Sequence, residues 1–153
     1  MKLLLPFLLS FFSISLFGQT TTQTDSLSFC FTKYKVPEGC NAEVEYQVSC
    51  DNYSMIWLYM NEKMLATSSG MYVDQLTRQV KVLKKDTITC YLLNEKVKGY
   101  RISFKKGAGT AYQLIVYGIA NHQPVLVQLI LDKEPKKNED IPEFPRQIIR
   151  LTK

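Results

Sequence analysis

The alternation of apolar and polar residues predicts strands along most of the chain, because successive side chains of a strand point to opposite faces. Residues 42–48 alternate in this way and predict a strand with one face in solvent. Residues 55–60 are a continuous apolar run with the only tryptophan, which is typical of a strand buried on both faces. An earlier predicted strand, residues 27–36, ends at the turn sequence Pro37-Glu38-Gly39.

The second half of the chain contains four more extended segments, which are separated by short polar turns. Short turns between consecutive strands imply an antiparallel meander. The four predicted strands cover residues 87–93, 97–105, 111–120 and 125–131.

Two segments instead carry apolar residues at i, i+3, i+7 and i+10, the spacing of one helix face. The first predicts a helix over residues 70–84, with an N-cap in Thr67-Ser68-Ser69. The second predicts a helix over residues 141–151, with Asp140 as its cap and Pro142 in its first turn. This order of elements predicts an α+β fold, an antiparallel sheet of about six to eight strands with the two helices packed on it.

The N-terminus has the three-part plan of a secretory signal over residues 1–18: a lysine, an apolar run and a small residue at Gly18. We expect cleavage after Gly18; an uncleaved anchor is the alternative, because Leu16 is not the usual small residue. The protein is then periplasmic or secreted, and no membrane span remains. Residues 19–26 are expected to be a mobile polar leader, and residues 27–153 a single domain.

Four cysteines in an exported chain favour two disulfides. A strand over residues 41–49 would separate Cys40 from Cys50 by about 30 Å, and a helix by about 15 Å, whereas bridged Cα atoms lie about 4.4 to 6.8 Å apart. If the chain turns around Cys40, residues 30 and 50 become cross-strand neighbours. Of the three pairings, we therefore predict Cys30 with Cys50 and Cys40 with Cys90.

The chain has 19 Lys and Arg against 14 Asp and Glu, a net charge of +5, which falls by one if Lys2 leaves with the signal. The excess is spread along the sequence and favours solubility and weak attraction to anionic surfaces. Nucleic-acid binding needs a dense basic stripe with aromatic residues, so we expect no nucleic-acid partner.

Two sequence features could suggest a catalytic or phosphate-binding site, but each fits an ordinary turn better. His122, the only histidine, lies between Asn121 and Gln123 on a predicted hairpin turn, where an exposed side chain is expected rather than a general base. The stretch Lys105–Thr110 contains two glycines, but a phosphate-binding loop needs its lysine after the glycines and a helix next. We therefore predict a glycine hairpin turn.

Paired carboxylates are the remaining candidates for catalysis, since glycosidases use two of them. Glu43 and Glu45 lie on the solvent face of a predicted strand, and Glu139 and Asp140 precede the second helix. We predict no catalytic residue among them. With one histidine and four oxidised cysteines, we also expect no metal site and no cofactor.

The segment Phe31–Gly39 (FTKYKVPEG), Gly99 within Val97-Lys98-Gly99-Tyr100, and two strands that lead into a C-terminal QIIRL segment resemble the Mog1/PsbP-like domains. The resemblance covers most of residues 19–153, although Cys40 stands where such domains usually have a tryptophan after the glycine. It implies an α+β fold and a non-catalytic accessory or binding role.

The chain lacks sets of catalytic residues but is rich in aromatic residues, which suit binding surfaces because a tyrosine buries its ring and keeps a polar tip. We therefore expect an exported, non-catalytic domain that binds another protein or a cell-envelope component. Two alternatives stay open: a small hydrolase or lyase that uses carboxylates and tyrosines, and an inhibitor or immunity-type protein. The strand aromatics are Tyr46, Trp57, Tyr59, Tyr91, Tyr100, Tyr112 and Tyr117.

Overall fold

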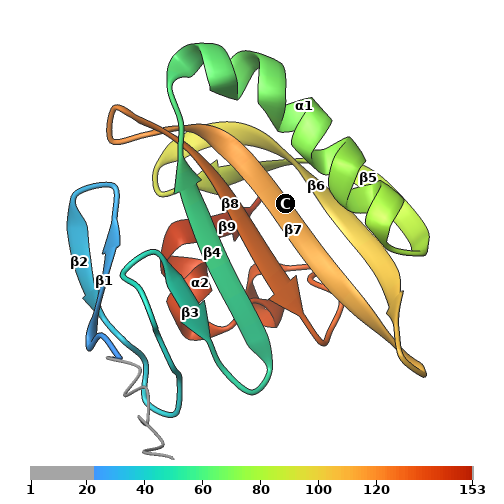
Figure 1. Cartoon of the computed structure of the whole chain (residues 1–153), viewed down its shortest axis with the longest axis horizontal. Helices are drawn as coiled ribbons and strands as arrows, with labels where there is room; N and C mark the ends of the chain where they lie inside the picture. Colours follow the sequence, from blue (N-terminus) through green and yellow to red (C-terminus); the bar gives the residue numbers. More distant parts are fainter. Residues whose placement is uncertain (1–22, 153) are drawn as a thin grey trace, which may run out of the picture.

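The structure is a computed structural model that describes residues 23–152; the predicted signal and residues 19–22 of the predicted leader lie outside the described residues. The predicted α+β class is confirmed: one antiparallel sheet of seven strands curls into a half-barrel, with a long helix on one face (Figure 1). The neighbouring strands of this sheet are, in spatial order, β3 (Gln47–Ser49), β4 (Tyr53–Tyr59), β8 (Gln123–Leu131), β7 (Gly109–Ala120), β6 (Glu95–Lys106), β5 (Val82–Leu92) and β9 (Ile149–Leu151).

The predicted meander is confirmed, since β5, β6, β7 and β8 pair with one another in sequence order. The β6–β7 turn is Gly107-Ala108, where Gly107 has a φ of 59°. A positive φ at the first turn residue suits glycine, which carries no Cβ. The β7–β8 turn, Asn121-His122, has a positive φ at both residues, 45° and 62°.

Helix α1 (Glu62–Gln79) begins and ends earlier than the predicted range 70–84. Val73 and Leu76 of the predicted inner face pack on the sheet, but Val80 and Leu83 lie beyond the helix and are exposed, so the prediction was wrong for the second half of that face. It begins early because Asn61 is the N-cap: its side-chain oxygen accepts a hydrogen bond from Met64 N at 2.7 Å. Val73 of α1 packs on Ile102, Ile115 and Leu126 of the sheet. No helix among residues 23–152 is long and apolar enough to cross a membrane.

The other face of the sheet carries the larger part of the core, covered by the N-terminal hairpin and a short helix. The predicted strand 27–36 is two strands, β1 (Ser26–Phe29) and β2 (Thr32–Lys35), because the chain reverses at Cys30-Phe31. Trp57 and Met55 of β4 point into this core, whereas Leu58 is 37% exposed. The prediction that β4 is buried on both faces was therefore wrong.

The predicted helix 141–151 was also wrong in its extent. After the 3₁₀ turn η1 (Asn138–Asp140), helix α2 (Glu143–Ile148) has six residues and continues directly into β9. The chain leaves the helix because Leu93 N donates a hydrogen bond to Ile148 O at 2.7 Å, and Ile149 then pairs with Leu92 of β5. An open sheet edge thus converts the end of an apolar helical pattern into a strand.

The predicted disulfides were wrong. Cys40 is bonded to Cys50, with Cα atoms 4.4 Å apart, while Cys30 and Cys90 are free and buried. Residues 41–49 do not form one strand, so the two cysteines are not held apart: a bend and a turn occupy residues 43–46, and Asn41 and Ser49 exchange two backbone hydrogen bonds of 2.8 Å. The chain returns to its starting point within nine residues, which brings the two thiols together.

Candidate functional site

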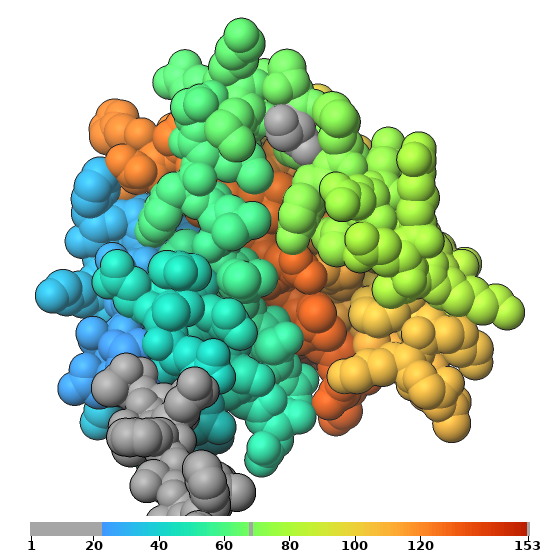
Figure 2. All heavy atoms as spheres, viewed as in Figure 1, coloured from blue at the N-terminus to red at the C-terminus, as the bar shows by residue number. Residues whose placement is uncertain are grey.

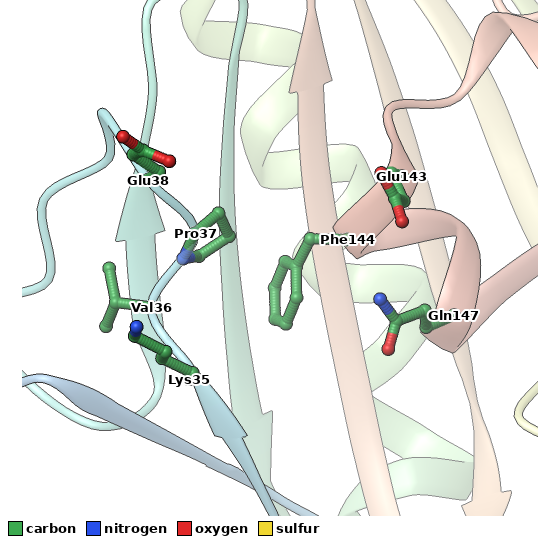
Figure 3. A pocket seen from close by; sticks show the side chains of 7 residues that line it. All are labelled: Lys35, Val36, Pro37, Glu38, Glu143, Phe144 and Gln147. Atoms are coloured by element: carbon green, nitrogen blue, oxygen red, sulfur yellow. The ribbon is translucent and has the colours of Figure 1, made fainter.

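A groove runs between the Pro37-Glu38-Gly39 turn and α2, on the face of the sheet away from α1 (Figure 3). It consists of two adjoining cavities, of about 500 and 270 Å³, that share Pro37, Glu38, Glu143 and Phe144. We call this site the α2 groove. Its other lining residues are Lys35, Val36, Gly39, Cys40, Cys50, Asp51, Asn52, Tyr53, Pro142 and Gln147.

The first wall of the α2 groove is a tight turn, as predicted from its sequence. Cys40 N donates a hydrogen bond to Pro37 O at 3.1 Å, and Gly39 has a φ of 76°. Glycine tolerates the left-handed conformation that the third position of such a turn requires. The Cys40–Cys50 disulfide then anchors the end of the turn to the chain that enters β4. This wall is therefore held covalently.

Aromatic rings form the floor of the α2 groove. Phe144 of α2 lies edge-on against Tyr34 of β2, with ring centroids 5.7 Å apart, and only 7% of it is exposed. Tyr53 is also buried, and its hydroxyl lies 3.9 Å from Cys40 Sγ. Burial raises the pKa of Tyr53 to about 12, so the phenol is neutral and offers a hydroxyl group to the floor.

The rim of the α2 groove is acidic. Figure 3 places Glu38 on the turn and Glu143 on α2, on opposite sides of Phe144, and Asp51 lines the smaller cavity. Lys35 is the cation that lines the larger cavity. The chain as a whole is basic, so three carboxylates around an aromatic floor mark this groove as a local reversal of charge.

A second, more open cavity of about 670 Å³ lies between the first half of α1 and the ends of β6 and β7. Its wall includes Tyr117, which stacks on Tyr100 with ring centroids 6.3 Å apart. Burial raises the pKa of Tyr117, and the neighbouring Tyr100 adds to the effect. Because Glu62 and Glu95 face Lys96 and Lys98 around this cavity, its charges balance and favour neither sign of ligand.

His122 and the Lys105–Thr110 stretch both lie at hairpin turns, as predicted. His122 is exposed on the β7–β8 turn, and the glycines of the Lys105–Thr110 stretch lie in and beside the β6–β7 hairpin turn. Among residues 23–152, no group of three or more His, Cys, Asp or Glu side chains is placed to hold a metal ion.

The carboxylate pairs Glu43/Glu45 and Glu139/Asp140 line neither the α2 groove nor the cavity beside α1; Glu139 lines only a small cavity of about 100 Å³ next to Leu151. Glu43 and Glu45 are exposed in the bend and the turn before β3, so the predicted strand at this position was wrong. Asp140 caps the 3₁₀ turn rather than a long helix: its carboxylate accepts hydrogen bonds from the backbone of Lys136 and Lys137, at 3.0 and 2.9 Å.

Cys30 and Cys90, predicted to be bonded, are buried thiols. Burial raises the pKa of each to about 11. A nucleophilic cysteine needs a thiolate, which a lowered pKa provides, so these two side chains act as small apolar groups of the core.

Sequence reasoning identified the turn of the α2 groove but not the groove itself. Phe144 belongs to the segment predicted as a helix over residues 141–151, and nothing in the local pattern indicates that Pro37 lies opposite it. Comparison with known proteins adds no family: no family model matches this chain, and no curated protein matches it.

Proposed function

We propose that this chain is a non-catalytic binding domain of an exported protein, and that the α2 groove holds an extended segment of a partner protein with a basic side chain. The observation that carries the proposal is the aromatic floor with carboxylates on opposite rims. A lysine or arginine seated there meets Glu38 and Glu143 while its aliphatic stem lies against Phe144.

Two further features support a binding role. The Cys40–Cys50 disulfide braces one wall, which reduces the entropy that the groove loses when a ligand orders it. A disulfide also suits the oxidising compartment that the signal-like segment 1–18 predicts. Export itself stays a prediction from the sequence.

The test is a selection of random peptides on the immobilised protein, with counter-selection on a Glu38→Gln/Glu143→Gln variant. The control variant, Glu43→Gln/Glu45→Gln, removes the same charge from exposed carboxylates outside the groove. We expect Lys- or Arg-containing peptides that bind the wild type and the control, and that bind the groove variant at least tenfold more weakly, since each charge-assisted hydrogen bond contributes about 1.5–3 kcal/mol.

Selected peptides without a basic residue, or equal binding by all three proteins, would show that the groove is not the site. Turnover of any substrate class by the purified protein, abolished by one substitution, would refute the non-catalytic assignment.

A further inference from the structure

Basic side chains that are scattered in the sequence gather at one end of the molecule. There the end of α1 and the start of β5 meet the β6–β7 turn: Lys105 N donates a hydrogen bond to Lys81 O at 3.0 Å, and Val82 pairs with Phe104. Figure 2 shows these yellow-green and amber segments at the right of the molecule. We call this region the basic end; its cations are Arg78, Lys81, Lys84, Lys85, Lys105 and Lys106.

Few of these cations are neutralised. Lys85 pairs with Asp74 at 3.1 Å, and Lys84 pairs with Asp86 at 2.8 Å. The hydrogen bond from Lys84 lowers the pKa of Asp86, to which Arg101 also contributes. The other four cations, Arg78, Lys81, Lys105 and Lys106, are exposed and form no ion pair in the part of the chain that the structure describes.

Apolar side chains lie among these charges. Val80 is 37% exposed and Leu83 is 48% exposed, and each is adjacent in sequence to a basic residue. The pairing of β5 with β6 shifts register between Val82 and Lys84, so Leu83 is the extra residue of a β-bulge. A β-bulge changes the direction in which a side chain points. The edge of β5 is also open here, because β9 pairs only with residues 90–92.

We propose that the basic end docks on the surface of an anionic lipid bilayer. The lysines and Arg78 meet the phosphate headgroups, and Leu83 and Val80 reach the boundary of the acyl chains. Charge alone would suit any polyanion, but exposed aliphatic groups between cations gain free energy only where an apolar phase lies beneath the charge. The basic end shares no residue with the α2 groove, so this proposal is independent of the function proposed above.

The test is co-sedimentation of the protein with vesicles of phosphatidylcholine, with or without added phosphatidylglycerol. We expect binding only to the anionic vesicles, and weaker binding as salt rises. Lys105→Gln/Lys106→Gln lowers the partition coefficient by about fivefold per lysine. Leu83→Ser also lowers the partition coefficient, and it does so even at a salt concentration that screens the charges.

The matched control is Lys33→Gln/Lys63→Gln, which removes two exposed lysines from β2 and the start of α1. This control changes the net charge by as much as Lys105→Gln/Lys106→Gln does. It should change the partition coefficient by no more than about twofold, because charges outside the basic end are screened over a Debye length of about 8 Å at physiological salt. Circular dichroism of each variant shows that the fold is retained. No binding to anionic vesicles, or equal losses for the two lysine pairs, overturns the proposal. So does binding that Leu83→Ser leaves unchanged, which would indicate a soluble polyanion.

Discussion

Val97 of β6 occupies the space that a side chain on Gly118 of β7 would need. The pairing of Lys98 with Tyr117 places Val97 opposite Gly118, and a methyl group on the glycine would overlap Val97 Cγ1 and lie 3.0 Å from Val97 Cβ. The two residues form a small-to-large pair across the sheet, so the glycine is required for packing rather than for backbone freedom.

Gly118→Ala should destabilise the protein by about 1–3 kcal/mol through overpacking. Because the obstructing group is a side chain, the second substitution Val97→Ala should recover most of the loss. Urea denaturation of the single and double variants measures this coupling. Gly99→Ala is the contrasting case: its methyl group would lie 2.7 Å from the backbone oxygen of Ile115, so no side-chain substitution should rescue it. Additive losses at residues 97 and 118 would contradict the packing argument.

Phe31→Gly should stabilise the protein. Cys30 and Phe31 form the β1–β2 turn with φ values of 45° and 67°, and Phe31 is 78% exposed. A bulky residue in the left-handed region costs about 1–3 kcal/mol, and this ring loses little burial when it is removed. We expect a gain of about 1 kcal/mol, seen as a higher Tm. Phe31→Ala, which keeps the Cβ, is the control and should gain less; an equal gain would mean that the ring, not the backbone, is unfavourable.

Cys40→Ser/Cys50→Ser should lower the free energy of unfolding by about 3 kcal/mol, the chain-entropy value for a loop of this length. The bond spans ten positions, and its loss frees the turn wall of the α2 groove. Thiol titration of the wild type should find no reactive cysteine in the native state and two in denaturant, Cys30 and Cys90. Four reactive thiols in denaturant would contradict the disulfide.

Stability should fall as the pH rises above 9. Burial raises the pKa of Cys30 and Cys90 from 9.0 to about 11, and that of Tyr53 from 10.0 to about 12. Between these values the unfolded chain has released a proton that the folded protein still holds, so each group lowers stability by up to about 1.4 kcal/mol per pH unit. Denaturation at stepped pH measures the slope. In the variant Cys30→Ala/Cys90→Ala, the pH at which stability begins to fall should move from about 9 toward about 10, where Tyr53 begins to contribute. If that pH does not change, groups other than the two cysteines cause the loss of stability.

The meander was predictable because its information is local. Alternating side chains and two-residue turns at Gly107-Ala108 and Asn121-His122 fix both the strands and their register. The start of α1 was missed because Thr67, which fits an N-cap, instead donates its hydroxyl to Lys63 O within the helix. The cap is Asn61, six residues earlier.

What the sequence does not reveal depends on contacts between distant segments. The strand β9 exists because β5 offers an open edge, and the disulfide because the chain bends between Asn41 and Ser49. The α2 groove needs Pro37 and Phe144 to meet across the core, and the basic end needs Lys81 to meet Lys105. The hydrophobic periodicity within one helix or strand cannot predict these contacts between distant segments.

The topology of the sheet also implies an order of folding. The pairs β5–β6, β6–β7 and β7–β8 join neighbours in sequence, whereas β4 pairs with β8 across α1 and the whole meander, from Tyr53 opposite Leu131 to Tyr59 opposite Val125. We expect the local pairs to form first, because they close short loops. A refolding intermediate should therefore present the apolar edge of β8 before β4 arrives, and aggregation during refolding should depend on how fast that one strand docks.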